Sequence, residues 1–206
     1  QFQAEAVILR DGREAVIWVD SQSGHGILDP AYWVAENYYR GKYRNHSSAK
    51  ADGTRVSPRN HLTIFKNLNA KQFLQFDHLL KPESRVLEVG CSFGGVLRNI
   101  ANAGVAACHA VEPNQEDAEF ARKLVPEAEI FPKSFEDADL QKEFYDLIIG
   151  FEVLEHIPSP STFLMKVSSL LKYGGVVNFE VPNHRAALLK FYKETTYDRF
   201  YYHQAH

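Results

Sequence analysis

Cysteines, excess positive charge and long apolar runs are scarce in this chain, and each scarcity argues against a class of protein. The 206 residues include two cysteines, Cys91 and Cys108, too few for a disulfide framework, which indicates a reducing, cytoplasmic compartment. No apolar run approaches the roughly 18 residues of a membrane helix. The first residues show no basic region followed by an apolar one, so we expect no secretory signal. The formal net charge of −3 argues against a protein that coats nucleic-acid phosphates. We therefore expect neither a membrane nor a nucleic acid as partner.

The remaining composition, 45% hydrophobic and 24% charged, fits one globular α/β domain with a smaller appendage. The chain begins at Gln1 rather than at a methionine and stops at YYHQAH. We expect it to be a domain of something longer, with an incomplete C-terminus and other domains as further partners.

The first 80 residues predict a hairpin, an aromatic stretch, a loop and a helix. Two β-rich runs flank Asp11-Gly12, a dipeptide that suits tight hairpin turns, and predict a hairpin over residues 6–19. The aromatic stretch that follows is expected to be partly helical from Ala31, and the polar residues 46–60 indicate a loop or lid. A helix over residues 62–80 is predicted from apolar residues at roughly helical spacing: Leu62, Phe65, Leu68, Phe73, Phe76 and Leu80.

From Arg85 onward, strand and helix patterns alternate. Strands are predicted at residues 85–89, 107–112, 129–131, 145–151 and 174–181, and helices at 94–103, 114–125 and 161–172. Such alternation predicts a Rossmann-like, mostly parallel sheet with helices on both faces. The expected organisation is an N-terminal hairpin and lid over residues 1–60, followed by a ligand-binding α/β domain over residues 61–206.

A glycine-rich turn after the first of these strands is the strongest indication of a ligand. Its sequence, EVGCSFGG, places Gly90, Gly94 and Gly95 between a strand and a helix N-terminus, where backbone amides favour a polar or anionic group. It lacks the middle glycine of the dinucleotide fingerprint and the Gly-Lys-Ser/Thr ending of a P-loop. The carboxylate of Glu88 would repel a pyrophosphate but attract a cation. The turn therefore fits the amino-acid end of S-adenosylmethionine better than a pyrophosphate.

Acidic and aromatic residues follow the next strands. Glu112 ends the second strand, where a carboxylate can accept hydrogen bonds from both ribose hydroxyls of an adenosine. The stretch KSFEDADL follows the third strand and is expected to wall the adenine, with Phe135 stacking or packing there. The stretch GFEVLEHIPSP is expected to cross the mouth of the pocket. Cys91 is interpreted as a small residue that lets the turn close.

Four stretches, VLEVGCSFGG, AVEPN, FYDLIIGFEVLEHIPSP and LLKYGGVVNFEVPN, together resemble class I S-adenosylmethionine-dependent methyltransferases over residues 85–183. The resemblance implies S-adenosylmethionine as the cofactor. It implies Glu88, Gly90 and Gly94 around the methionine moiety, Glu112 at the ribose, Ser134 and Phe135 near the adenine, and Phe151 near the sulfonium. Cys91 and Pro113 are also expected among the cofactor-binding residues.

Both ends of the chain carry weaker resemblances. The stretch GILDPAYWVAENYYRGKYR is similar to the lead-in of bacterial methyltransferases that act on sugars and secondary metabolites. Many of those carry paired zinc cysteines upstream, and no cysteine precedes Cys91 in this chain. The tail YYHQAH resembles the Tyr-His-Glu-His stretch of sugar C-methyltransferases but has Gln204 in place of the acid and one extra residue.

Methyl transfer to a hydroxyl or an acidic carbon needs a base, and imidazole suits that role near neutral pH. The candidates are His156 at the end of the fourth strand and, if the tail folds back, His203 and His206. The alternative for His156 is a ring that packs at the sheet edge, and for the tail a docking segment. We expect no metal, because neither H-E-x-x-H nor H-x-x-E-H is present.

The sequence thus predicts a methyltransferase that acts on a small molecule, with a hydroxyl of a sugar or natural-product intermediate as the favoured acceptor. Three alternatives stay open. One is a C-methyltransferase acting on a nucleotide sugar, and another is a cofactor-binding domain with a regulatory or scaffolding role. The third is a nicotinamide oxidoreductase, which the missing middle glycine argues against.

Overall fold

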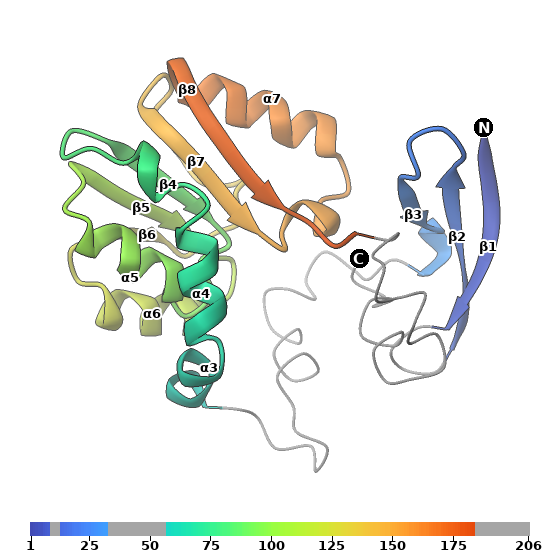
Figure 1. Cartoon of the computed structure of the whole chain (residues 1–206), viewed down its shortest axis with the longest axis horizontal. Coiled ribbons are helices and arrows are strands. Elements are labelled where there is room, and N and C mark those ends of the chain that lie inside the picture. Colours follow the sequence, from blue (N-terminus) through green and yellow to red (C-terminus); the bar gives the residue numbers. More distant parts are fainter. Residues whose placement is uncertain (9–12, 33–56, 184–206) are drawn as a thin grey trace. The chain divides into compact units, whose positions relative to one another are not determined.

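The structure is a computed structural model, and it describes residues 1–8, 13–32 and 57–183. These residues form two units, an antiparallel sheet and a parallel α/β unit (Figure 1). Apart from a single 3-10 turn, η1 (Pro30–Tyr32), the predicted aromatic helix lies outside the described residues. So do the Asp11-Gly12 turn, most of the predicted lid and the histidine tail.

The N-terminal unit is a three-stranded antiparallel sheet in the order β1 (Phe2–Ile8), β2 (Glu14–Asp20) and β3 (Gly26–Leu28). Antiparallel pairing of β1 with β2 confirms the predicted hairpin and extends it as far as the pair Phe2 and Asp20. One face of the sheet buries a small cluster of apolar side chains: Ala15, Ile17, Val19 and Leu28.

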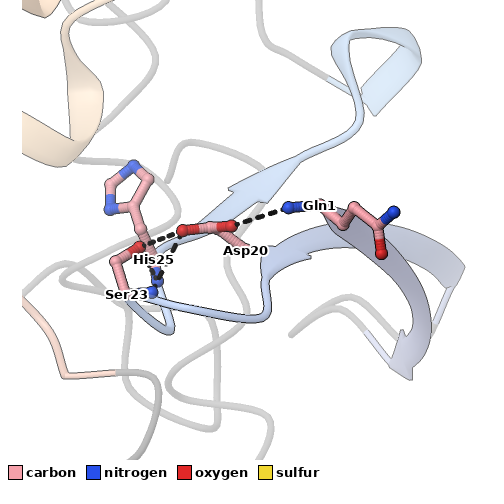
Figure 2. A network of polar contacts seen from close by, with 4 residues as sticks. All are labelled: Gln1, Asp20, Ser23 and His25. Carbon is pink, nitrogen blue, oxygen red and sulfur yellow. Dashed lines mark hydrogen bonds and ion pairs between the residues drawn. The ribbon is translucent and has the colours of Figure 1, made fainter.

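The third strand was not predicted, and a side-chain network explains the turn that leads to it. The carboxylate of Asp20 accepts hydrogen bonds from the Ser23 backbone N–H at 3.0 Å and hydroxyl at 2.7 Å (Figure 2). Its other oxygen lies 3.3 Å from the amino group of Gln1, and the His25 N–H donates to the Ser23 hydroxyl at 3.2 Å. The hydrogen bonds from Ser23 hold the pKa of Asp20 far below its usual value. The carboxylate thereby fixes the turn that carries the chain from β2 into β3.

The α/β unit is built on five parallel strands, as the alternating pattern predicted. They are β4 (Arg85–Val89), β5 (Ala107–Val111), β6 (Glu129–Phe131), β7 (Tyr145–Phe151) and β8 (Leu171–Glu180), in the spatial order β6-β5-β4-β7-β8. The chain runs outward from β4 through β5 to β6, then returns to the other side of β4. This reversal makes a switch point between β4 and β7, and ligands bind outside the carboxyl ends of the strands at such a point.

Helices cover the two faces of this sheet (Figure 1). On one face, α5 (Gly95–Asn102) and α6 (Gln115–Leu124) pack over alternate strand residues such as Val86, Ala110 and Ile149. On the other face, α7 (Pro160–Leu170) packs over the intervening residues, among them Leu87 and Ile148. The period-two alternation of the strands therefore assigns each side chain to one of two cores.

The prediction of one helix over residues 62–80 was wrong. The chain forms α3 (Pro58–Ile64), capped by the Ser57 hydroxyl, then α4 (Lys66–Phe73) and a 3-10 turn, η2 (Asp77–Leu79). The backbone leaves helical geometry at Phe65, with φ −92° and ψ 7°. The apolar residues therefore do not form one buried stripe. Phe76 is fully buried, whereas Phe65 and Leu68 are 38% and 42% exposed.

One strand boundary also differs from the prediction. Helix α3 spans residues 60 and 61, and the division of the chain into residues 1–60 and 61–206 stays a prediction. Strand β8 begins at Leu171, three residues before its predicted start at Gly174. Leu171 pairs with Tyr145 and Val176 with Leu147, so residues 172–175 stand opposite Asp146 alone. Gly174, with φ +79°, permits this bulge, and Lys172 returns to bind the Asp146 carboxylate at 2.7 and 2.8 Å.

Candidate functional site

The turn after β4 is shaped by two glycines that no other residue replaces without strain. Gly90 has φ +75°, and a Cβ added there would lie 2.7 Å from Cγ2 of Val153. Gly94 has φ +78°, and its Cβ would lie 3.2 Å from the Cβ of Ala121. Cys91, between them, packs its side chain into the core beneath α5, and burial raises the pKa of its thiol well above the usual value. The interpretation of Cys91 as a packing residue agrees with this position.

Glu112 follows β5 and is fixed by two backbone groups. One carboxylate oxygen accepts the N–H of Ser92 at 2.8 Å, and the other accepts the N–H of Asn114 at 2.9 Å. Ser92 belongs to the glycine turn and adopts φ +51°, a left-handed conformation uncommon for a residue other than glycine. Pro113 lies between Glu112 and Asn114, the N-cap residue of α6. The predicted ribose acid is thus held against the predicted methionine turn.

Glu88 lies at the end of β4 and is 4% exposed. Among the described residues, its Oε2 atom has no hydrogen-bond partner. Burial, with the nearby charge of Glu112, raises the pKa of Glu88 to about 8, and a backbone hydrogen bond from Leu97 opposes the shift. An orphaned buried carboxyl oxygen is costly unless a ligand donates to it. An ammonium group would satisfy it, so the residues present fit the amino-acid end of S-adenosylmethionine.

Ser134 and Phe135 lie in the turn after β6. The Ser134 hydroxyl accepts a hydrogen bond from the N–H of Asp137 at 3.3 Å. The backbone carbonyl of Ser134 accepts one from the N–H of Ala138 at 3.1 Å. Phe135 is 4% exposed and packs against Phe163 of α7, with ring centroids 4.7 Å apart. Of the two uses expected for Phe135, packing is the one that the structure displays.

Phe151 ends β7 at the switch point. Its ring lies 6.3 Å, centroid to centroid, from the buried ring of Phe76. Both rings belong to the core on the α5 side of the sheet. Phe151 therefore stands at the carboxyl edge, beside the strand that carries the glycine turn.

The stretch that crosses the predicted pocket mouth carries a carboxyl cluster that sequence reasoning missed. Glu152 has φ +54°, and its N–H donates to the carbonyl of Glu180 at the end of β8 at 2.9 Å. The side chain of Glu155 is 10% exposed, and neither of its oxygens has a hydrogen-bond partner within the described ranges. Burial and the charges of Glu152 and Glu180 raise its pKa to about 8. The sequence offered one signal, two acids three residues apart directly after a buried strand.

His156 lies in this cluster, in η3 (Leu154–His156), and the tail histidines His203 and His206 lie outside the described residues. The His156 side chain is 12% exposed, and its Nε2 lies 3.8 Å from Oε1 of Glu155. Within residues 1–8, 13–32 and 57–183, no group of three or more His, Cys, Asp and Glu side chains is placed to hold a metal ion. None of the helices described is long and apolar enough to span a membrane.

Sequence reasoning also missed the contact between α3 and the glycine turn. Phe93, in the turn, is 2% exposed and meets His61 of α3 edge-on, with ring centroids 5.0 Å apart. Phe93 meets Phe120 of α6 in the same manner at 5.7 Å. The turn is therefore packed from two sides by aromatic rings. No spacing in the sequence indicated that α3 and α6 converge there.

The fold and this edge define a class I S-adenosylmethionine-dependent methyltransferase, and comparison with known proteins agrees. A family model described as a methyltransferase domain matches residues 62–206. The chain belongs to this methyltransferase family, which confirms the resemblance found in the sequence.

Curated relatives are ubiquinone biosynthesis O-methyltransferases. The protein from Shewanella sp. (strain ANA-3) is 30% identical over 116 residues, which cover 54% of this chain and 48% of that protein. The protein from Vibrio atlanticus (strain LGP32) is 28% identical over 155 residues, 65% of each chain. The chain thus spans about half to two thirds of the length of these relatives.

Solved structures share the fold. The plantazolicin methyltransferase BpumL, in complex with a pentazolic desmethylPZN analogue and SAH, aligns with a TM-score of 0.55 and 16% identity, covering 70% of this chain and 58% of that one. An S-adenosylmethionine-dependent methyltransferase from Thermotoga maritima aligns with a TM-score of 0.51 and 22% identity, covering 66% and 64%. These likenesses support the Rossmann-like α/β class assigned from the sequence.

Proposed function

We propose that this protein transfers a methyl group from S-adenosylmethionine to a hydroxyl of a small-molecule acceptor. The observation that carries the proposal is the pair Glu88 and Glu112 at adjacent strand ends, one with an orphaned buried oxygen and one fixed by two backbone N–H groups. The names of the curated relatives favour oxygen as the methylated atom. Within that class, we keep a sugar or natural-product intermediate as the expected acceptor and the cytoplasm as the expected location.

The bound cofactor would supply an electrophilic methyl group on a sulfonium, so the chain's own task is to bind, orient and exclude water. Glu88 would hold the ammonium, and the strained turn from Gly90 to Gly94 would let the backbone approach the amino-acid end. Glu112 would accept the ribose hydroxyls. Phe151 would cover the sulfonium with an apolar surface, and the turn at Ser134 and Phe135 would wall the adenine.

His156 is the base candidate that lies at this edge of the sheet. Its ring is mostly buried beside Glu155, a carboxyl that stabilises a protonated imidazole when it is ionised. A proton taken from an acceptor hydroxyl would rest on the ring. The tail histidines His203 and His206 stay as alternative bases.

Calorimetric titration with S-adenosylmethionine and S-adenosylhomocysteine tests the cofactor site. Wild type is expected to bind both, and Glu112→Ala to weaken binding at least about ten-fold, because it removes a charge-assisted acceptor and releases Ser92. The matched control is Glu119→Ala, which removes an exposed carboxylate from α6. A folded wild type that binds neither compound would refute the proposal.

Turnover then separates an enzyme from a cofactor-binding module. The protein is incubated with S-adenosylmethionine and a panel of hydroxylated sugars and natural products, and S-adenosylhomocysteine is quantified. An acceptor methylated on oxygen supports the proposal, and an acceptor methylated on carbon supports the C-methyltransferase alternative. Tight cofactor binding without product across the panel favours the regulatory or scaffolding role.

A further inference from the structure

Lys166 is the side chain that ties α7 to the turn after β6. Its ammonium donates to three backbone carbonyls, those of Phe135 at 2.7 Å, Glu136 at 3.0 Å and Ala138 at 2.9 Å. A lysine ammonium has three donors, so each has a carbonyl of this one turn as its acceptor. The ammonium also lies 5.1 Å from the centroid of the Phe135 ring. Lys166 therefore uses all three of its donors to bind α7 to this one turn.

The attachment fixes the direction in which the turn faces. In a helical turn the carbonyls point one way and the N–H groups point the other, and a lysine at the carbonyl end stabilises the turn as it would a helix C-terminus. Burial lowers the pKa of the Lys166 ammonium, and three neighbouring carboxylates, those of Glu136, Asp137 and Asp139, oppose this shift. The N–H groups of Asp137 and Ala138 in turn donate to the hydroxyl and the carbonyl of Ser134, so the turn is also fixed at its beginning. The turn follows β6, whose last residue, Phe131, accepts the N–H of Glu112 through its carbonyl at 3.0 Å.

We propose that Lys166 is a positioning residue for base recognition: by holding the carbonyls of Phe135, Glu136 and Ala138, it fixes the turn that is proposed to wall the adenine, and with it the preference for that base. This inference rests on the proposed function, because it takes the ligand to be an adenosine compound. Lys166 acts through the backbone of the turn and touches no reacting atom. Its effect is therefore expected in affinity and base selectivity rather than in the chemical step.

The test compares two ligands that differ at the edge of the base. S-adenosylhomocysteine and S-inosylhomocysteine, in which an oxo group replaces the adenine amino group, are titrated by calorimetry into wild type and Lys166→Met. Wild type is expected to prefer the adenine compound. Lys166→Met is expected to lose about ten-fold affinity for that compound and much less for the hypoxanthine analogue, so the preference shrinks.

The matched control is Lys172→Met. Lys172 also binds protein oxygens, those of Asp146, but it does so at the opposite, amino-terminal edge of β7. This variant is expected to keep the wild-type preference. If Lys166→Met does not fold, Lys166→Gln replaces it, since the shorter neutral amide cannot reach all three carbonyls.

The outcomes separate the two proposals. A wild type that fails to bind S-adenosylhomocysteine refutes the proposed function. A wild type that binds but does not distinguish the two bases overturns the role of Lys166. That role is equally overturned if the folded Lys166 variant keeps the wild-type preference, whether its affinities are unchanged or equally weakened, or if Lys172→Met loses the preference as well.

Discussion

Glu88 and Glu112 end adjacent parallel strands and are both buried, yet their surroundings differ in kind. Both oxygens of Glu112 accept backbone N–H groups, at 2.8 and 2.9 Å, whereas Oε2 of Glu88 has no acceptor role with any residue that the structure describes. The hydrogen bonds stabilise an ionised Glu112, and its charge helps to keep Glu88 protonated. The protein itself thus stabilises the charge of Glu112, whereas the charge of Glu88 would be stabilised by a cationic ligand.

The affinity for S-adenosylmethionine is expected to increase with pH because of Glu88. Its pKa is raised to about 8, so below that pH the carboxyl must lose a proton before it can pair with the ligand's ammonium. Between pH 6 and pH 8 the dissociation constant should fall by up to about ten-fold per pH unit. Glu88→Gln should bind weakly and without this dependence, and Glu119→Gln should follow wild type. Calorimetry at a series of pH values measures the dissociation constant. A wild-type dissociation constant that does not change with pH would contradict the assignment of Glu88 to the ammonium.

Glu155 is expected to make the fold less stable as pH rises. A carboxyl whose pKa is about 8 in the folded protein and ordinary when unfolded releases a proton on unfolding between roughly pH 4.5 and 8, so stability falls across that window. Glu155→Gln removes this loss. We expect the variant to match wild type near pH 5 and to exceed it at pH 8 by on the order of 1 kcal/mol or more. Urea unfolding at both pH values measures the difference in unfolding free energy between the variant and wild type. The same difference at pH 5 and at pH 8 would disprove the role of Glu155.

Gly90→Ala should destabilise the protein through two separable effects. The left-handed φ costs about 1–2 kcal/mol for a residue with a Cβ, and the 2.7 Å approach to Val153 adds about 1–3 kcal/mol of overpacking. Gly104→Ala is the control for the first effect, because Gly104 has φ +74° with nothing within 4 Å of an added Cβ. In a Val153→Ala background, Gly90→Ala should show the first effect only, because Val153→Ala alone already includes the loss of that side chain's packing. Urea unfolding of wild type and the four variants tests this, and equal losses for Gly90→Ala and Gly104→Ala would rule out the steric contribution.

His156→Asn should lower kcat by about 10²–10⁴ on the acceptor found in the panel, because general-base catalysis contributes that range. The dissociation constant for S-adenosylhomocysteine should stay close to that of wild type. Steady-state kinetics with calorimetry gives both quantities. If kcat is retained, the catalytic base would be His203 or His206. The same substitution at each of these residues would then show which of them is the base.

The central sheet was predictable because each parallel strand is a short apolar run bounded by turn residues. The strand at residues 145–151 and the acid after residue 111 follow from such local signals. Contacts between distant segments were not predictable. Glu180 meets Glu152 only because β8 pairs with β7 after a helical crossover, and Lys166 contacts carbonyls 28–31 residues earlier in the chain. The helix expected over residues 62–80 failed for a related reason: Phe76 is buried in the core whereas Phe65 and Leu68 are exposed, so the apolar spacing did not mark one helix face.

The hydrogen bond from Ser92 to Glu112 has a consequence for anyone who wishes to change the ligand. The carboxylate that we propose as the ribose contact also supports the left-handed backbone of Ser92, in the turn that we propose for the methionine end. Altering Glu112 to admit a cofactor analogue with a modified sugar would therefore loosen the glycine turn at the same time. Engineering of cofactor preference should begin at the turn proposed for the base, and leave Glu112 unchanged.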